Sequence, residues 1–386
     1  MNENCIYAGK IRESRKTDGM RILYVTTIAM TMNFFKSLAG ELFECGHTLD
    51  IACNTSDGAV DPFFSELGCR VYSVDCSRSP LNSGNIRAIS QIRRIVKEGH
   101  YDVVHCHTPI AAACTRFACR KLRRSGKPRV FYTAHGFHFF KGAPKKNWMV
   151  YYPIEKICSY MTDVLITINS EDFELAGKNF NAGRTCFIPG VGIDTERFAS
   201  AEQGRFDDIC HPAIFSVGEL NDNKNHEAVI RALKEIPNAH YYIAGEGSLR
   251  EHLLAVADTL ELSERVHLLG YRNDVGSLYK NMDILVHPSF REGLPVSVME
   301  AMAAGLPIVG SDIRGMRDLL ENDCRVLFNP LDQGEIAQKI SAVLNESALR
   351  TELTKKNLDV IGKYDSRVLN QMYVDLLEDC ISNRLP

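Results

Sequence analysis

The chain has 386 residues, 45% of them hydrophobic and 24% charged, with a formal net charge of −3. This composition is that of a soluble globular protein, and the length exceeds one ordinary hydrophobic core, so two domains are expected. No run of eighteen apolar residues occurs, so any membrane contact is expected to be peripheral.

The small net charge hides a difference between the two halves of the chain. Residues 1–192 contain 25 Lys and Arg against 17 Asp and Glu, whereas the remainder contains 20 against 31. A basic half suits an anionic membrane surface or a phosphorylated acceptor, although charge also drifts by chance along a chain. We expect the halves to face different partners, with no nucleic acid among them.

The cysteines and the first residues indicate the compartment. The 13 cysteines are an odd number without a Cys-x-x-Cys pair or zinc-type spacing, which predicts reduced, cytosolic thiols. Residues 1–19 are polar, lack the apolar core of a signal peptide or anchor, and are expected to be a disordered extension. The first strand begins directly at Met20, so an alternative start there is conceivable.

Short apolar strands alternate with helices along both halves. In the first half, with a helix over 33–45, we expect strands at 21–25, 48–52, 71–74, 103–106, 129–133 and 164–168. After a Pro- and Gly-rich break at 188–194, we expect strands at 213–218, 241–244, 266–269, 284–287, 308–309 and 326–328. The alternation predicts two parallel, doubly wound α/β domains, 20–192 and 193–367. An amphipathic helix over about 368–386 is expected to pack back on the first domain.

The histidines of the first half lie on two predicted strands. His135 follows the strand 129–133, at the carboxyl end where ligands of open parallel sheets bind. There it could donate a hydrogen bond to a sugar hydroxyl or an acceptor, and a structural histidine is the alternative. We expect His105 and His107 to face opposite sides of their strand and to share no metal.

Basic and aromatic residues crowd the region 116–148. The basic ones are Arg116, Arg120, Lys121, Arg123, Arg124, Lys127, Arg129, Lys141, Lys145 and Lys146, and the aromatic ones are Phe117, Phe137, Phe139, Phe140 and Trp148. This region could form a surface that touches anionic lipid, with a solvated basic face as the alternative.

In the second half, a cation follows a glycine turn. Gly218 ends a strand, Glu219 comes next, and Lys224 precedes a helix, where it could neutralise a diphosphate or be an ordinary surface lysine. The segment 245–248 lacks the third glycine of a dinucleotide fingerprint, which argues against a dehydrogenase. The chain has no Asp-x-Asp triplet to hold a divalent ion, so we expect neither metal nor cofactor.

The most informative segment runs from Glu292 to Glu300. Gly293 and Pro295 fix a tight backbone at a helix entrance, where free N–H groups and the helix dipole attract a phosphate. Two carboxylates would repel that phosphate unless they accept hydrogen bonds from hydroxyls of the same ligand. A sugar nucleotide carries both groups, while an ordinary helix start with a solvated Glu300 is the alternative.

Together these residues resemble the retaining glycosyltransferases of family 4, which have the GT-B fold. The similarity covers nearly the whole chain from Met20 and is most specific in 292–309, which is similar to the family's Glu-x7-Glu signature and following helix. It also includes His135, the interdomain 189–194 with Phe198, Lys224, and Gly270 with Asp274. Within the family, 133–140 and 293–298 look most like bacterial capsule, exopolysaccharide and lipid-linked oligosaccharide enzymes.

The resemblance implies two Rossmann-like domains facing a central cleft, and roles for single residues. Glu292 would bind hydroxyls of the transferred sugar, Glu300 the ribose, and His135 the donor sugar across the cleft. Backbone near Tyr271 and Arg272 would meet the base. The catalytic groups would be His135, Glu292 and Lys224, and further donor contacts would come from Gly218, Glu219, Gly293, Leu294, Pro295 and Val296. Family members transfer with retention, with the leaving phosphate helping to deprotonate the acceptor.

Two features depart from the family pattern. An Arg usually follows the glycine equivalent to Gly218, and Glu219 stands there instead. We expect Lys224 and helix N-termini to suffice, because a related polysaccharide subgroup shares Gly-Glu-Leu, although Arg314 or Arg291 could substitute. The early Gly-Gly loop is also absent from 26–33, which puts acceptor and phosphate contacts there in doubt.

The sequence therefore predicts a cytoplasmic, metal-independent hexosyltransferase, peripheral at the inner face of the plasma membrane. It would move a sugar from UDP to a hydroxyl of a polyprenyl-diphosphate-linked glycan in bacterial surface polysaccharide synthesis. The basic domain would take the acceptor and the acidic domain the donor. The alternatives are a nucleotide-sugar 2-epimerase of the same fold and a non-catalytic sugar-nucleotide-binding protein.

Overall fold

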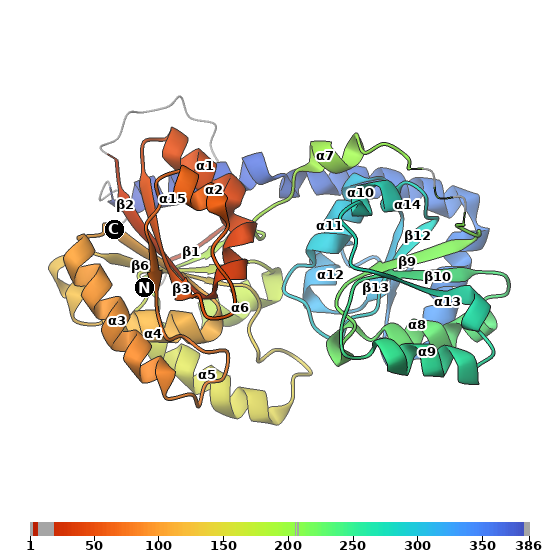
Figure 1. Cartoon of the computed structure of the whole chain (residues 1–386), viewed down its shortest axis with the longest axis horizontal. Helices are drawn as coiled ribbons and strands as arrows, with labels where there is room; N and C mark the ends of the chain where they lie inside the picture. The colour runs from red at the N-terminus through yellow and green to blue at the C-terminus, as the bar shows by residue number, and fades with distance from the viewer. Residues whose placement is uncertain (1–2, 7–18, 205, 207, 382–386) are drawn as a thin grey trace. The chain divides into compact units, whose positions relative to one another are not determined.

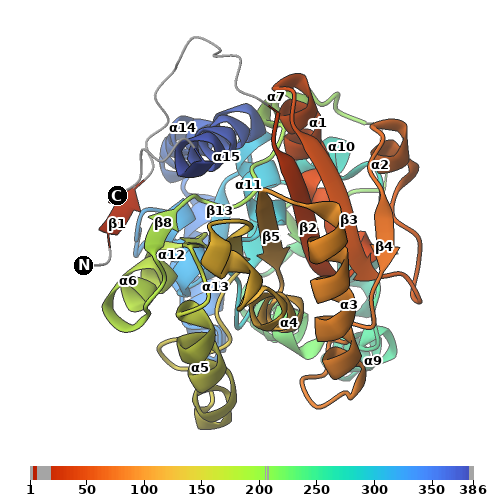
Figure 2. The ribbon, with the colours of Figure 1, turned by 90° about the vertical axis from the view of Figure 1, so that its left-hand side faces the viewer.

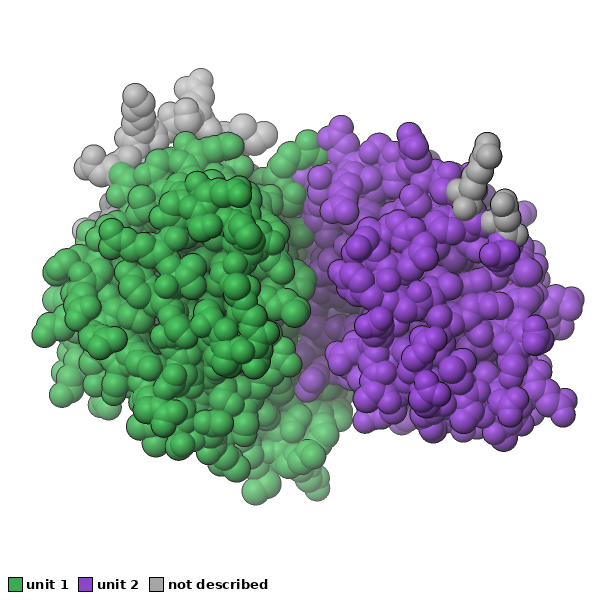
Figure 3. Space-filling view, viewed as in Figure 1, with its two compact units in different colours: residues 1–192, 366–386 green, residues 193–365 purple. Residues whose placement is uncertain are grey.

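A computed structural model describes residues 3–6, 19–204, 206 and 208–381 (Figure 1). The chain divides into two compact units: unit 1 comprises residues 1–192 and 366–386, and unit 2 comprises residues 193–365 (Figure 3). The return to unit 1 thus comes after Asp365, where the sequence analysis placed it after 367. No helix among the described residues is both long enough and apolar enough to cross a bilayer.

Unit 1 is an eight-stranded parallel sheet of order β1-β8-β7-β6-β5-β2-β3-β4. Its strands are β1 (Glu3–Ile6), β2 (Arg21–Ile28), β3 (Thr48–Asn54), β4 (Val71–Ser73), β5 (Val103–His107), β6 (Arg129–Ala134), β7 (Val164–Thr167) and β8 (Arg184–Phe187). Its helices are η1 (Ala29–Phe35), α1 (Lys36–Glu44), α2 (Pro62–Glu66), α3 (Gly84–Gly99), α4 (Pro109–Cys119), η2 (Leu122–Ser125), α5 (Lys145–Ser159), α6 (Ser170–Asn179) and α15 (Ser366–Ile381).

Alternation along β2, an interior strand of the sheet, builds the two cores of unit 1. Ile22 and Tyr24 join the core formed with α1 and α15, whereas Leu23 and Val25 join the core formed with α3 and α4. Figure 2 shows these helices beside the sheet of unit 1. Because successive side chains of a strand point to opposite faces, one apolar run serves both helical layers. Helix α15 buries Leu369 within the first of these cores, so the end of the chain completes unit 1.

Unit 2 is a six-stranded parallel sheet of order β11-β10-β9-β12-β13-β14. Its strands are β9 (Ala213–Val217), β10 (His240–Ala244), β11 (Val266–Gly270), β12 (Ile284–His287), β13 (Ile308–Ser311) and β14 (Leu327–Phe328). Its helices are α7 (Thr195–Ala199), η3 (Asp222–Lys224), α8 (His226–Ala232), η4 (Leu233–Glu235), α9 (Arg250–Thr259), η5 (Ser263–Arg265), α10 (Val275–Tyr279), α11 (Val296–Ala303), α12 (Arg314–Leu319), α13 (Gln333–Asn345), α14 (Ser347–Ile361) and η6 (Gly362–Tyr364).

The predicted N-terminal extension needs a correction. Residues 3–6 form β1, which pairs in parallel with β8 from Glu3 opposite Arg184 onward. Without β1, β8 would be an edge strand with unpaired backbone groups, and such an edge accepts another strand readily. The rest of the predicted disordered segment, residues 1–2 and 7–18, lies outside the described residues.

Candidate functional site

The loops at the carboxyl end of the unit 2 sheet are joined by backbone hydrogen bonds. Gly218 N donates to Ala244 O (3.0 Å), and Gly245 N donates to Gly270 O (2.8 Å). Gly245 has a φ of +156°, and a Cβ there would come within 1.9 Å of Gly218 O. Glycine at 245 is therefore required for the loops after β9 and β10 to approach this closely.

Asparagines connect the loop after β9 to the loop after β12. Asn223 Nδ2 donates to Arg291 O (3.0 Å), and Asn223 O accepts from Phe290 N (2.9 Å). Asn225, which has a left-handed φ of 52°, donates from Nδ2 to Pro288 O (3.1 Å). These bonds hold the segment before α11 in register with the segment that carries the predicted cation.

Lys224 and Glu292, separated by 68 residues in sequence, form an ion pair. Lys224 Nζ lies 2.8 Å from Glu292 Oε1, and His287 Nε2 lies 3.4 Å from the same oxygen. The aliphatic part of Lys224 crosses Gly218, where a Cβ would come within 3.0 Å of Lys224 Cε. The glycine turn therefore leaves space for the lysine to reach the carboxylate.

The partners of Glu292 determine its ionisation. Burial opposes the charge, but the hydrogen bond to His287 and the Lys224 ammonium outweigh it and lower the pKa of Glu292 to about 2. Burial lowers the pKa of His287, with Glu292 acting in the opposite direction. Glu292 is therefore a carboxylate near neutral pH, able to accept hydrogen bonds but not to act as an acid.

The first turn of α12 supports the backbone at the start of the motif. Arg314 is buried, and its Nε donates to Glu292 O (3.1 Å). A Cβ at Gly315 would come within 2.3 Å of Gly293 O, so α12 lies directly against this backbone. Arg314, which the sequence offered as a substitute cation, is thus engaged by the main chain of the motif.

Glu300 lies in a different environment, inside α11. Tyr279 Oη lies 3.2 Å from Glu300 Oε2 and 3.1 Å from Ser297 O. Burial raises the pKa of Glu300 to about 7, and the hydrogen bond from Tyr279 and the charge of Arg197 only partly oppose this. Glu300 therefore titrates near neutral pH.

The other predicted donor residues lie around this cluster. Pro295 is the residue before the first turn of α11, and Leu294 and Pro295 are buried, whereas Val296 is half-buried. Glu219 and Tyr271 are exposed on their loops. Arg272, the residue after Tyr271, pairs with Asp274 (Nε to Oδ1, 2.8 Å).

The sheet of unit 1 ends in histidines. His107 Nδ1 lies 3.1 Å from His135 Nε2, and the rings of His105 and His107 are 4.2 Å apart. The prediction that His105 and His107 face opposite sides is wrong, because residues two apart in a strand share a face. Burial lowers the pKa of His105 to about 3 and that of His135 to about 4, so these rings are uncharged near neutral pH.

The predicted basic surface of unit 1 also needs a correction. Arg116 is buried, with Nη1 2.7 Å from Glu155 Oε2 and its guanidinium 4.2 Å from the centre of the Tyr132 ring. It faces inward because α4 packs that side of the helix against α5 and β6. Among the other basic residues, Lys127 pairs with Asp102 at 2.5 Å. Less positive charge is therefore available on this face than the sequence count indicates.

Comparisons with known proteins identify the family. Residues 210–359 match the family described as "Glycosyl transferases group 1", and residues 21–169 match "Glycosyl transferase 4-like". EpsD of Bacillus subtilis (strain 168), which is named as a glycosyltransferase, is 37% identical over 321 residues, 78% of this chain and 83% of EpsD. The chain belongs to the group 1, family 4-like glycosyltransferases.

Further relatives and solved structures are also similar to this glycosyltransferase. The Escherichia coli UDP-Gal:alpha-D-GlcNAc-diphosphoundecaprenol alpha-1,3-galactosyltransferase is 29% identical over 317 residues, 76% of this chain and 78% of that protein. A glycosyltransferase structure from Rickettsia africae has a TM-score of 0.76 at 16% identity and covers 95% of this chain and 100% of that one. Anabaena HepE in complex with UDP has a TM-score of 0.73 at 19% identity, covering 93% and 100%. The predicted GT-B fold is confirmed.

The partners of the two glutamates in this glycosyltransferase were not found from sequence. His287 ends β12 and Tyr279 ends α10, and each contacts a signature glutamate. The only sequence signal for His287 is its place at the end of a strand directly before the motif. Tyr279 carries no such signal, because its contact with Glu300 depends on how α10 packs against α11.

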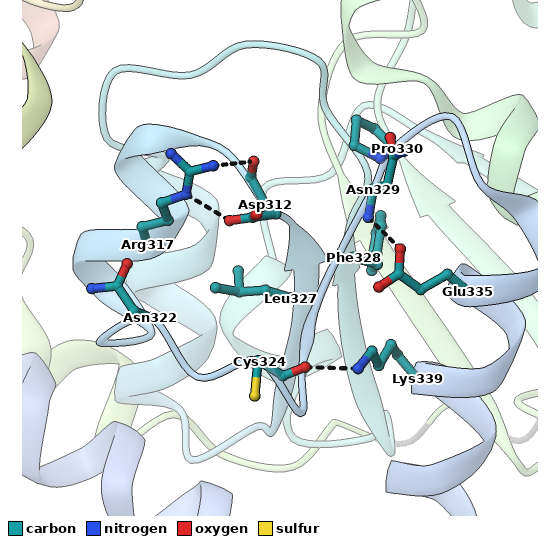
Figure 4. A pocket seen from close by; sticks show the side chains of 10 residues that line it. All are labelled: Asp312, Arg317, Asn322, Cys324, Leu327, Phe328, Asn329, Pro330, Glu335 and Lys339. Atoms are coloured by element: carbon teal, nitrogen blue, oxygen red, sulfur yellow. Dashed lines mark hydrogen bonds and ion pairs between the residues drawn. The ribbon is translucent and has the colours of Figure 1, made fainter. Parts of the chain in front are cut away.

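A separate pocket of the glycosyltransferase lies beside β14 (Figure 4). Its lining residues are Asp312, Arg317, Asn322, Cys324, Leu327, Phe328, Asn329, Pro330, Glu335 and Lys339. Lys339 Nζ donates to Cys324 O (2.7 Å), and Asp312 pairs with Arg317 (2.6 Å). The residues predicted to bind a sugar nucleotide are not among those that line it, so this pocket is separate from the Glu292 cluster.

Proposed function

We propose that this glycosyltransferase transfers a sugar with retention, and without a metal, from a UDP-sugar to a hydroxyl of a polyprenyl-diphosphate-linked glycan. The observation that carries the donor part is the Lys224–Glu292 pair at the entrance of α11. It combines an ammonium, a carboxylate and the N–H groups of a helix start in one place. A sugar diphosphate needs all three.

Each group of the pair has a distinct task in the proposed reaction. Lys224 would move from Glu292 to the diphosphate, where it stabilises the charge that develops on the leaving phosphate. Glu292, released from the lysine but still in contact with His287, would accept hydrogen bonds from hydroxyls of the transferred sugar. Glu300 would accept hydrogen bonds from the ribose, and backbone near Tyr271 and Arg272 would meet the base.

The proposed transfer needs no protein nucleophile. The leaving phosphate would take the proton of the attacking hydroxyl on the same face of the sugar, so that the new bond keeps the donor's configuration. His135, uncharged near neutral pH, would donate a hydrogen bond to the donor sugar without adding a charge. With Glu219 at the usual Arg position, the diphosphate would depend on Lys224 and backbone N–H groups.

The names of relatives support the choice of substrates. The E. coli relative is named for UDP-Gal and a diphosphoundecaprenol-linked acceptor. A Campylobacter jejuni relative, 38% identical over 122 residues, is named for N,N'-diacetylbacillosaminyl-diphospho-undecaprenol. Both names describe a glycan on a polyprenyl diphosphate, so we propose the same acceptor class here, in the synthesis of a bacterial surface polysaccharide.

A lipid-linked acceptor requires access to a membrane surface, and α5 offers a suitable face. Met149 (77% exposed), Val150, Ile157 (56%) and Tyr160 are exposed large side chains at helical spacing on and after this helix. Lys145 and Lys146 lie exposed in its first turn, and further lysines and arginines precede it. Such a helix suits peripheral binding to anionic lipid, so we propose that unit 1 binds the inner face of the plasma membrane through α5.

A donor panel tests the proposal. UDP-, GDP- and ADP-sugars are scored for protection from thermal unfolding and for transfer to a short polyprenyl-diphosphate sugar. We expect a UDP-sugar to be selected, and Glu292→Ala to abolish transfer while largely preserving UDP binding. Wild-type activity in Glu292→Ala would contradict the assignment. Solvent deuterium entering the sugar's second carbon without an acceptor would instead indicate an epimerase, and binding without turnover would indicate a sensor.

A further inference from the structure

His107 is a buried histidine that contacts His135. Its side chain lies in the interior of unit 1, with ring centres 4.3 Å from Phe35 and 5.1 Å from Tyr24. Its Nδ1 lies 3.1 Å from His135 Nε2. Its Nε2 is buried and has no hydrogen-bond partner in the part of the chain that the structure describes.

The unpartnered nitrogen determines which ring donates. In one arrangement, His135 donates from Nε2, and His107 then carries its own proton on Nε2, where a buried N–H finds no acceptor. In the other, His107 donates from Nδ1, and its Nε2 is a bare acceptor against aromatic rings. Buried N–H groups without a partner are rarer in proteins than under-satisfied acceptors, so the second arrangement is favoured.

We propose that His107 is a positioning residue that holds His135 in the Nδ1–H tautomer, so that His135 presents an N–H donor to an oxygen of the ligand. This proposal rests on the proposed function, in which His135 contacts the donor sugar. With Nε2 accepting from His107, Nδ1 is the nitrogen left to meet a ligand. Burial lowers the pKa of both rings, so near neutral pH the tautomer rather than the charge is controlled.

The segment after β2 supports the pair. Phe35, the last residue of η1, lies 4.3 Å from the His107 ring and 6.0 Å from the His135 ring. Thr27, at the end of β2, donates from its N–H to Thr108 Oγ1 (3.2 Å), beside His107. Phe35 therefore packs against both histidine rings, and Thr27 fixes the residue next to His107.

Nitrogen NMR of the full chain labelled with 15N-histidine tests the tautomer directly. His135→Ala identifies the His135 signals by their loss. In the wild type, His135 should show a protonated Nδ1 and an unprotonated Nε2. A protonated Nε2 on His135 in the wild type would overturn the proposal without any variant of His107.

Two substitutions separate positioning from packing. His107→Leu removes the donor and should let His135 populate the Nε2–H tautomer, whereas His107→Asn can keep an N–H near the Nδ1 position and should retain the wild-type tautomer. Unchanged His135 signals in a folded His107→Leu would contradict the proposal. If His107→Leu does not fold, the wild-type spectrum and His107→Asn still decide it.

Kinetics give the functional readout. We expect His107→Leu to lower kcat about 10- to 100-fold with little change in UDP affinity, and His107→Asn to recover most of the loss. Equal losses in both variants would indicate packing alone and would contradict the proposal. If His135→Ala transfers at the wild-type rate while the tautomer is as expected, the proposed role of His135 fails and the tautomer control stands.

Discussion

The two sheets of this glycosyltransferase end in different chemistry. In unit 2, an ammonium and a carboxylate lie 2.8 Å apart at the end of the sheet. In unit 1, His107 Nδ1 lies 3.1 Å from His135 Nε2, and burial keeps both imidazole rings uncharged near neutral pH. Two parallel sheets of similar architecture thus end in charged groups in unit 2 and in neutral hydrogen-bonding groups in unit 1. This difference fits the proposed division of labour, in which unit 2 would meet the diphosphate and unit 1 would meet hydroxyls.

A second contrast lies within unit 2. Glu292 and Glu300 belong to one short segment, yet the pKa of Glu292 is lowered to about 2 and that of Glu300 is raised to about 7. Lys224 and His287 stabilise the charge of Glu292, whereas the hydrogen bond from Tyr279 and the charge of Arg197 only partly oppose the burial of Glu300. The carboxyl groups of Glu292 and Glu300 therefore titrate in separate pH ranges.

Removing the positive charge of Lys224 in unit 2 should have the largest effect on the rate of transfer. Lys224→Ala deletes the proposed diphosphate partner and leaves Glu292 with His287, so we expect transfer to fall about 10²- to 10³-fold. Steady-state rates with a UDP-sugar measure this. Lys355→Ala, an exposed lysine of α14, is the matched control. Activity of Lys224→Ala within twofold of the control would contradict the contrast between the two units, because the reaction would then not need the Lys224 cation of unit 2.

Disturbing the backbone under Glu292 should have the next largest effect. A Cβ at Gly315 would come within 2.3 Å of Gly293 O, so Gly315→Ala must displace the entrance of α11. We expect about tenfold weaker UDP-sugar binding and a loss of about 1–3 kcal/mol in unfolding free energy. Gly362→Ala is the control, because a Cβ there meets nothing within 4 Å. Equal binding by both variants would show that this backbone does not form the donor site.

The raised pKa of Glu300 should make the stability of the protein depend on pH. Its pKa is raised from 4.5 to about 7, so its contribution to stability is present below pH 4.5 and is lost as the pH rises through 7. Glu300→Gln should therefore raise the unfolding free energy by about 1–2 kcal/mol at pH 8, which thermal unfolding detects as a higher Tm. At pH 5 the substitution should change Tm little. Exposed Glu98→Gln is the control.

The same residue should control donor binding. If ionised Glu300 accepts hydrogen bonds from the ribose, the affinity for UDP-galactose, whose diphosphate does not titrate in this range, should rise as the pH passes 7. Calorimetry at pH 6 and 8 measures this. A pH dependence that persists in Glu300→Gln would assign it to another group.

Changes on the exposed face of α5 should have the smallest effect on transfer. Met149→Asp combined with Ile157→Asp removes exposed apolar surface from α5. We expect about tenfold weaker binding to vesicles of anionic lipid, with transfer to a short water-soluble acceptor unchanged. Leu254→Asp, an exposed leucine of unit 2, is the control. Equal vesicle binding by the wild type, the double variant and Leu254→Asp would exclude α5 as the membrane contact.

The sequence predicted the two sheets because their strands are short apolar runs between glycine- and proline-rich loops. It also predicted Lys224, Glu292 and Glu300 as site residues, from a helix entrance and a family signature. It did not predict the ion pair between Lys224 and Glu292, which depends on asparagine bonds between loops 68 residues apart. Nor did it predict that Arg116 is buried, because its partner Glu155 lies on another helix, 39 residues away.

The proposed reaction is tested most directly by the configuration of its product. The purified protein is incubated with the selected α-configured UDP-sugar and a short polyprenyl-diphosphate sugar, and the anomeric proton of the new linkage is observed by NMR. The account predicts an α-linked product, in which the configuration at the transferred carbon is kept. A β-linked product would contradict it, because inversion requires a base on the opposite face of the sugar.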